Sequence, residues 1–274
     1  MSTIRKIPGE RRTGEAGYAA PALEKGLDIL ELLSTEAEGL SQNQVAQKLG
    51  RSASEIFRML AVLERRGYLV RVPDGSYRLS LRLFELAHRH PPIRRLLTVS
   101  LPLMQELAQR SRQSAHLVVH YARRILVVAQ VESPEPMGFS VRLGAHFPFR
   151  PDRASARVLT AFQPAEARAA MIEEMIENSE GRLAPRQVSA ALEAIAAQGH
   201  YRAPSDTLAA VHDLCCPIFD HSEGAVASLT VPYLAQRDVA VTVDEALALL
   251  METSGAISAA LGARPMPCGA RAVC

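Results

Sequence analysis

The sequence predicts an α+β protein with two domains. These are an N-terminal winged helix-turn-helix domain and a larger C-terminal α/β sandwich with a mainly antiparallel sheet, connected by linker helices. Three observations predict this class: two capped helices precede a hairpin signal, the pair Pro91 and Pro92 interrupts a helical stretch, and strand-like and helical segments alternate beyond Ser114. With 274 residues and 48% hydrophobic content, the chain can bury two cores.

Composition divides the chain into five segments. We expect a disordered arm at 1–20, the winged helix-turn-helix domain at 21–80, linker helices at 81–112, the C-terminal domain at 113–262 and a disordered tail at 263–274. The opening residues lack the apolar core of a signal peptide, and no window approaches the ~18 apolar residues of a membrane helix. We therefore expect a cytoplasmic protein without a membrane partner.

Capping signals predict the helices of the small domain. Leucines at helical spacing over residues 21–39 give a first helix with one buried stripe. Ser41 is followed three residues later by Gln44, and Ser52 is followed in the same way by Glu55, so two further helices begin at these serines. Two short capped helices in succession indicate a helix-turn-helix.

The outer face of the third helix is the candidate nucleic-acid surface. Its apolar stripe surrounds Ile56, and the 100° step of a helix places Ser54 and Arg58 on the opposite side. In helix-turn-helix proteins the N-terminal half of this helix contacts base edges in the major groove. We therefore expect contacts with double-stranded DNA from ten residues of the two helices and the hairpin: Ser41, Gln42, Ser52, Ala53, Ser54, Phe57, Arg58, Arg65, Arg71 and Arg78.

The next segment predicts a hairpin that would form the wing. Asp74 and Gly75 give a two-residue turn signal between strands at 68–72 and 76–80. This register sets Arg71 directly opposite Arg78, an unfavourable pair that a DNA phosphate between them would relieve. The alternative is that each arginine extends into solvent.

Charge is distributed unevenly along the chain. Residues 1–95 hold 16 Lys and Arg against 11 Asp and Glu, a balance of +5, and the remaining residues hold 15 against 18, a balance of −3. The two add to the net charge of +2. The basic excess of the first part suits a polyanionic partner.

The second part alternates strands and helices. Strands are expected at 115–121, 125–131, 139–143, 214–219 and 225–231, and helices at 152–162, 165–178, 186–198 and 244–261. This order predicts a sandwich of helices on a mainly antiparallel sheet.

The sequence contains no motif for catalysis or metal binding. It lacks a Gly-x-Ser-x-Gly elbow, a phosphate loop, a zincin motif and a dinucleotide fingerprint. His116 and His120 would lie roughly 13 Å apart in a strand, too far to share an ion. The 4 cysteines have neither metal nor disulfide spacing. We expect no catalytic residue, no metal and no cofactor; the alternative is an enzyme or metal-dependent binding module that carries a winged helix.

The order of these motifs resembles the IclR family of bacterial transcription regulators over about residues 20–262. The match runs through Leu40-Ser41, Arg66-Gly67-Tyr68-Leu69, Tyr77-Arg78-Leu79, Leu101-Pro102-Leu103, Arg142-Leu143-Gly144 and Cys216-Pro217-Ile218-Phe219-Asp220. The resemblance implies a sequence-specific regulator, a repressor or an activator, that forms homodimers or tetramers. It also implies that the C-terminal domain is a GAF-like effector-binding domain.

The resemblance further implies where an effector would bind. Seven residues fall in segments that line the cavity of the family: Arg153, Ser155, Arg157, Asp206, Asp213, Cys215 and Ser228. A buried guanidinium needs an anionic partner, so a carboxylic or aromatic acid is the expected effector. The chain departs from the family at Ser155-Ala156, where a Gly-Lys or Gly-Arg pair is usual, and at Asp213, where a cysteine is usual.

Overall fold

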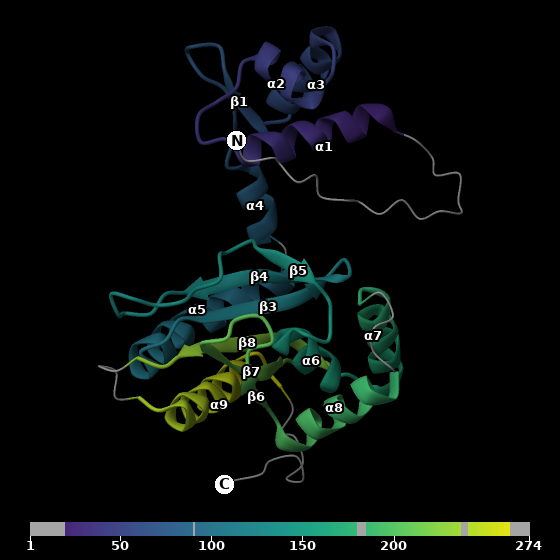
Figure 1. The fold of residues 1–274 in the computed structure, drawn as a ribbon. Helices are drawn as coiled ribbons and strands as arrows, with labels where there is room; N and C mark the ends of the chain where they lie inside the picture. Colours follow the sequence, from purple (N-terminus) through teal and green to yellow (C-terminus); the bar gives the residue numbers. More distant parts are fainter. Residues whose placement is uncertain (1–19, 90, 180–184, 237–240, 264–274) are drawn as a thin grey trace. The chain divides into compact units, whose positions relative to one another are not determined.

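The computed structural model describes residues 20–89, 91–179, 185–236 and 241–263. The chain divides into two compact units, Met1–His90 and Pro91–Cys274 (Figure 1). The boundary falls at the proline pair, so the helix that follows it belongs to the second unit. The predicted arm, apart from Ala20, and the predicted tail, apart from Ala263, lie outside the described residues.

The described part of the first unit consists of helices and one hairpin. In chain order these are α1 (Pro21–Ser34), α2 (Gln42–Leu49), α3 (Ala53–Arg65), β1 (Leu69–Arg71), β2 (Tyr77–Leu79) and α4 (Arg82–Arg89). Both predicted capping boxes form: the Ser41 hydroxyl accepts from the Gln44 N–H at 3.4 Å, and the Ser52 hydroxyl accepts from the Glu55 N–H at 3.4 Å. Each cap of this kind contributes about 1 kcal/mol to stability, so the helix starts are fixed locally.

The core of the first unit lies between its first three helices and the hairpin. Ile29, Val45 and Ile56 are fully buried, one from each helix, and Tyr77 of β2 packs against them. Burying each large aliphatic side chain contributes about 1.5–3 kcal/mol. This small core holds α3 against the hairpin and leaves the outer face of α3 free.

The hairpin has a different register from the predicted one. Its strands pair Leu69 with Leu79, Val70 with Arg78 and Arg71 with Tyr77. The loop is one residue longer than expected, because the Val72 N–H donates to the Ser76 carbonyl at 2.9 Å and Gly75 adopts a φ of 84°. An Asp-Gly pair suits this three-residue loop as well as the two-residue turn. The prediction that Arg71 faces Arg78 is therefore wrong.

The second unit is a single antiparallel sheet with helices on both faces. Its described elements are α5 (Pro91–Ser111), β3 (Ala115–Tyr121), β4 (Arg124–Val131), β5 (His146–Pro148), α6 (Ala154–Ala161), α7 (Ala165–Glu177), α8 (Pro185–Gln198), β6 (Tyr201–Pro204), β7 (Val211–Phe219), β8 (Ala225–Leu234) and α9 (Val243–Ala260). The strand order is β5-β4-β3-β8-β7-β6, and each neighbouring pair of these strands is antiparallel. The predicted sandwich is confirmed.

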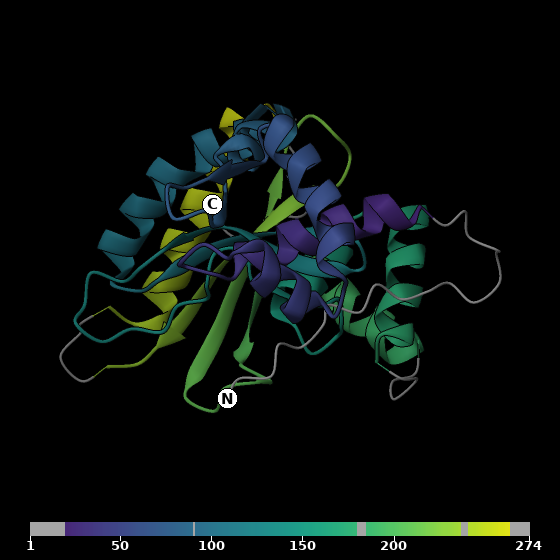
Figure 2. The same cartoon turned by 90° about the horizontal axis from the view of Figure 1, so that it is seen from above.

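The two faces of the sheet have separate cores. One core joins α5 and α9 to inward residues such as Leu117, Leu214 and Leu229. The other joins α6, α7 and α8 to residues such as Val118 and Cys215. Figure 2 shows α5 and α9 side by side, with α7 and α8 on the other side of the strands. Neighbouring residues of one strand therefore enter different cores.

Two strand positions differ from the prediction. Residues 139–143 form no strand; the ladder with β4 begins instead at His146, which pairs with Leu126. Strand β6 was not predicted at all, and it pairs with β7 from Tyr201 to Pro204. Both errors concern short edge strands, whose position depends on a distant partner rather than on local pattern.

The turn between β3 and β4 generates a stability prediction. Ala122 and Arg123 lie in the left-handed region, with φ of 47° and 62°, between the paired residues Tyr121 and Arg124. Such type I′ turns favour glycine. We expect Ala122→Gly to raise the free energy of unfolding by about 0.5–1 kcal/mol, because glycine adopts this backbone without a Cβ clash.

Thermal unfolding followed by circular dichroism measures this change, with an expected rise in midpoint of about 1–4 °C. The matched control is Ala169→Gly on the exposed face of α7, where φ is helical. It should lower the stability by up to about 1 kcal/mol. Destabilisation by both variants would contradict the turn assignment.

Candidate nucleic-acid interface and effector site

The outer face of α3 carries polar and cationic side chains. Ser54, Arg58 and Arg65 are exposed, and Phe57 is 54% exposed although it is aromatic. Ile56 on the inner face is fully buried, in agreement with the orientation expected from helical periodicity. Guanidinium groups can bind guanine edges, and apolar groups can contact thymine methyl groups. This face is therefore suited to reading a DNA groove.

Polar contacts hold the N-terminus of α3 in position. The Gln42 side chain donates to the Ala53 carbonyl at 3.0 Å, which links the start of α2 to the start of α3. Lys25 pairs with Glu55 at 2.6 Å, and this bond together with the Ser52 contacts lowers the pKa of Glu55 to about 2. Glu55 thus acts as a cap with a neutralising partner, which reduces its repulsion of a phosphate.

The wing arginines have different neighbours. The Arg71 guanidinium lies over the Tyr77 ring, 5.7 Å from its centroid. This cation–π contact positions the exposed guanidinium against the hairpin. Arg78 lies on the other face of the hairpin, next to Val70, and pairs with Glu38 at 3.3 Å. That pair is exposed and worth little, so Arg78 can exchange Glu38 for a phosphate.

The predicted effector residues converge on the face of the sheet that α6 covers. Strand pairing sets Cys215 opposite Thr230 and Pro217 opposite Ser228, so these side chains project from the same face. Ser155, in the first turn of α6, reaches this face and lies 3.1 Å from the Thr230 hydroxyl. We refer to Ser155, Cys215, Ser228 and Thr230 as the effector cluster.

The effector cluster is buried and incompletely hydrogen-bonded. Thr230 donates to the Cys215 sulfur at 3.2 Å, and burial raises the pKa of the Cys215 thiol to about 12. The Ser228 hydroxyl is fully buried and has no hydrogen-bond partner of ordinary geometry within the described residues. The cluster thus supplies neutral hydroxyl and thiol groups, together with an unused donor.

Charged side chains surround the cluster. Arg157 binds Asp206 at 2.8 Å, donates to the Tyr201 hydroxyl and lies over the Tyr201 ring. Arg153 occupies the N-cap position of α6 without a capping hydrogen bond from its side chain, and its guanidinium lies over the Phe147 ring, 5.2 Å from its centroid. Its Nε atom is buried and lies 3.9 Å from Asp152 Oδ1, but it has no hydrogen-bond partner among the described residues. Arg157 has an acidic partner at hydrogen-bond distance, and Arg153 Nε does not.

Asp213 adds a carboxyl group near these arginines. It lies opposite Pro232 on β8 and Ala203 on β6, on the same face as Cys215. Burial raises the pKa of Asp213, although a hydrogen bond from Ser205 and the charges of Arg153 and Arg157 oppose the shift. A carboxyl group in this position can share a proton with a bound acid more readily than an ordinary aspartate.

Sequence reasoning missed three residues of this site. Thr230 is the central hydrogen-bonding group of the cluster, Tyr201 anchors Arg157, and Phe147 supports Arg153. Thr230 could have been found, because it follows Ser228 by two residues in a strand and so shares its face. Tyr201 and Phe147 lie on the two strands whose positions were not predicted.

The histidines have structural surroundings. His116 is buried, and burial lowers its pKa to about 4, so it is neutral at physiological pH. His120 lies 2.8 Å from the Glu174 carboxylate. Within the ranges that the structure describes, no three His, Cys, Asp or Glu side chains come together as a metal site would require. No described helix is both long enough and apolar enough to cross a membrane.

Two family models match the chain in consecutive positions. The IclR helix-turn-helix domain matches residues 22–73, and the C-terminal domain of the bacterial transcriptional regulator IclR matches residues 93–259.

Relatives of similar length also match. The chain is 25% identical over 251 residues to the glycerol operon regulatory protein of Streptomyces griseus, covering 88% of this chain and 96% of that protein. It is 23% identical over 277 residues to the transcriptional repressor AllR of Klebsiella pneumoniae, covering 97% of this chain and 99% of that protein.

Solved structures share the fold. IclR of Thermotoga maritima aligns with a TM-score of 0.69 at 22% identity, over 88% of this chain and 98% of that chain. An IclR homologue of Microbacterium hydrocarbonoxydans in complex with 4-hydroxybenzoate aligns with a TM-score of 0.68 at 23% identity, with the same coverage of 88% and 98%. Because the C-terminal match alone spans more than half of the chain, the protein belongs to the IclR family of bacterial transcriptional regulators, with a DNA-binding helix-turn-helix domain and an effector-binding domain.

Proposed function

We propose that this regulator is a cytoplasmic repressor whose affinity for its operator changes when a small carboxylic or aromatic acid binds at the effector cluster. The observation that carries the proposal is a pair of buried atoms, Arg153 Nε and Ser228 Oγ, that form no hydrogen bond of ordinary geometry among the described residues; Arg153 Nε lies 3.9 Å from Asp152 Oδ1. An unsatisfied buried polar group costs about 1–3 kcal/mol. A polar ligand that satisfies such groups gains that stabilisation.

The surrounding charges favour an acid as the ligand. Arg153 and Arg157 lie near Asp213, and a carboxylate accepts hydrogen bonds from guanidinium groups in pairs. Aromatic surfaces at Phe147 and Tyr201 support the two arginines and suit a flat ligand. The structure of the relative with 4-hydroxybenzoate supports an aromatic acid, and the repressor AllR supports repression over activation.

Binding rather than catalysis is the proposed role of the second unit. The Cys215 thiol, with its pKa of about 12, is protonated at physiological pH and so is a poor nucleophile. The relatives are named as transcriptional regulators. Both observations favour a sensor over an enzyme.

We propose that α3 reads base edges with Ser54, Phe57 and Arg58, and that Arg71 binds the DNA backbone. Arg58→Ala should then weaken specific operator binding by about 1–3 kcal/mol and leave binding to random DNA nearly unchanged. Arg71→Ala should weaken binding to both DNAs and reduce the salt dependence. Fluorescence anisotropy on a selected operator and a scrambled duplex, at several salt concentrations, separates the two effects.

A control for these variants is Arg186→Ala, an exposed arginine of α8 in the second unit. It should change neither affinity nor salt slope. Equal losses on operator and random DNA for Arg58→Ala would make Arg58 a phosphate contact. An unchanged salt slope for Arg71→Ala would remove Arg71 from the interface.

We also propose that the protein is at least a dimer, because one winged helix contacts too few base pairs to select a genomic site. On α5, Met104 and Leu107 are buried in the core of their own unit, so they do not offer a surface to a second copy. On α4, by contrast, Leu83 and Leu86 are each 38% exposed. Sedimentation at micromolar concentration should give a species heavier than the 29.8 kDa chain.

The double variant Leu83→Glu with Leu86→Glu should shift that species toward the monomer and weaken operator binding. The matched change Leu143→Glu, at an exposed leucine of the second unit, should leave association intact. A wild-type chain that sediments as a monomer with and without DNA would contradict the dimer.

The effector site has its own test. We expect Ser155→Trp to fill the space beside Thr230 and to abolish the thermal stabilisation and operator release that an active acid produces in wild type. The ligands are a panel of carboxylic and aromatic acids that includes 4-hydroxybenzoate. Coupling of ~1–3 kcal/mol would change operator affinity about 5- to 150-fold in wild type.

Ser155→Ala is the matched control, because it removes the hydroxyl without filling space. It should keep most of the response. Arg153→Gln covers the case in which the tryptophan variant does not fold, and it should weaken binding of anionic ligands selectively. An acid that releases the operator equally from wild type and from Ser155→Trp would refute the placement of the site.

A further inference from the structure

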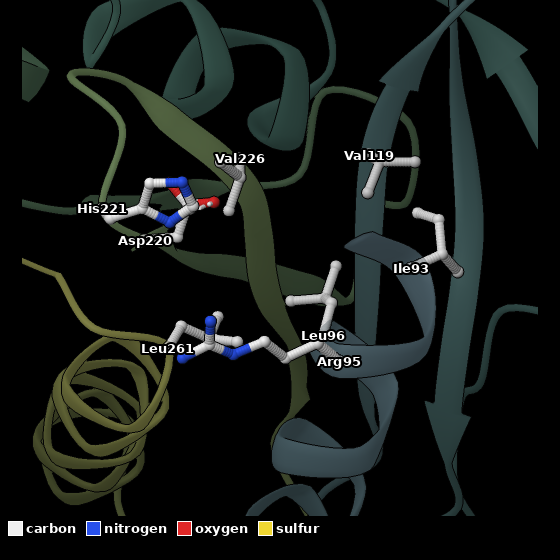
Figure 3. A pocket seen from close by; sticks show the side chains of 8 residues that line it. All are labelled: Ile93, Arg95, Leu96, Val119, Asp220, His221, Val226 and Leu261. Carbon is white, nitrogen blue, oxygen red and sulfur yellow. Dashed lines mark ion pairs between the residues drawn. The ribbon is translucent and has the colours of Figure 1, made fainter. Parts of the chain in front are cut away.

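A cavity of about 490 Å³ lies on the face of the sheet opposite the effector cluster. It is bounded by the start of α5, the strands β3 and β8, the β7–β8 turn and the residues after α9 (Figure 3). Most of its lining is aliphatic: Ile93, Leu96, Val119, Val226 and Leu261. Its volume falls within the roughly 300–1,000 Å³ that is typical of small-molecule sites. We refer to it as the α5–α9 cavity.

The α5–α9 cavity is separate from the effector cluster. Leu96, Val119 and Leu261 belong to the core beneath α5 and α9. Cys215 belongs to the core on the other face, beneath α6. The sheet itself lies between the two sites, so a molecule in one cannot contact residues of the other.

A cation lies at the edge of this aliphatic space. The Arg95 side chain extends from α5 across the cavity toward Leu261 (Figure 3). Within the described residues, Arg95 forms no ion pair or side-chain hydrogen bond, unlike Arg110 of the same helix, which binds Glu252 at 2.9 Å. A guanidinium beside apolar walls binds an anionic group with two parallel hydrogen bonds.

The acidic residue of the cavity is already engaged. Asp220 accepts a hydrogen bond from the Ser222 N–H at 2.7 Å and lies 3.7 Å from the His221 ring. The hydrogen bonds from Ser222 lower the pKa of Asp220, and the nearby charges of His221 and Arg95 add to this shift. Asp220 therefore stays charged in the same edge region, and its charge disfavours a ligand with a second carboxylate.

We propose that the α5–α9 cavity binds a hydrophobic monocarboxylate, with the carboxylate on Arg95 and the apolar body against Leu96, Val119 and Val226. The aliphatic lining suits the apolar body of the ligand. The Arg95 guanidinium, which has no ion pair with any described residue, suits the carboxylate, and the charge of Asp220 restricts the ligand to a single carboxylate. Such a ligand contacts the first two turns of α5, directly after the boundary between the two units. The site is additional to the effector cluster and does not depend on the function proposed for it.

Octanoate and 1-octanol are the probes, because they differ in the charged group and share the alkyl chain. Isothermal titration calorimetry on the full chain should show that both bind and that octanoate binds more tightly. Arg95→Gln should weaken octanoate about 10-fold and change octanol less than about 2-fold, because only the acid uses the guanidinium. Arg94→Gln, the neighbouring arginine that does not line the cavity, should leave both affinities unchanged.

Two further variants assign the binding to this cavity. Val226→Trp fills the space and should abolish binding of both probes, whereas Ser155→Trp on the opposite face should leave both unchanged. Absence of octanoate binding at millimolar concentration, or equal binding to wild type and Arg95→Gln, would overturn the proposal. Loss of binding in Ser155→Trp would assign octanoate to the effector cluster instead. Arg95→Gln changes only an exposed residue, so it remains decisive if Val226→Trp does not fold.

Discussion

The alternation of side chains along β7 and β8 is the constraint on which both proposed ligand sites depend. Leu214 and Cys216 enter the core beneath α5 and α9, whereas Cys215 between them enters the core beneath α6. Because the period of a strand is two, a slip of one residue would exchange the two sets and bury Asp213 among aliphatic side chains. The long pairing from Val211 with Leu234 to Phe219 with Ala225 prevents that slip.

The small unit depends on local interactions, and so most of it could be predicted. The capping boxes at Ser41 and Ser52 need only residues three positions apart, and helical periodicity then orients Arg58 outward. The predicted hairpin register was wrong because Asp74 and Gly75 are compatible with two loop lengths. The longer loop is selected by pairing across the strands and by the bridge between Leu40 and Tyr77. A turn signal gives the presence of a hairpin, but not its register.

The effector cluster could be predicted only in part for the same physical reason. The resemblance to the family identified Ser155, Cys215 and Ser228. It did not identify Thr230, which lies next to them only because β7 pairs with β8 and α6 packs on these strands. Arg153 and Arg157 carry charges that the sequence displays plainly. Their partners Phe147 and Tyr201 lie on short edge strands that local pattern does not locate.

The energetics of switching place a requirement on α5. A ligand shifts a conformational equilibrium only by the difference between its affinities for the two states, so its contacts must change with the state. Met104 and Leu107 hold the C-terminal part of α5 rigidly in the core, whereas Ile93 is only partly buried in its first turn. The chain connects the two units through that first turn, whatever their arrangement. Under the proposed function, ligand contacts that differ between states can act along the chain on the DNA-binding helices only through the start of α5.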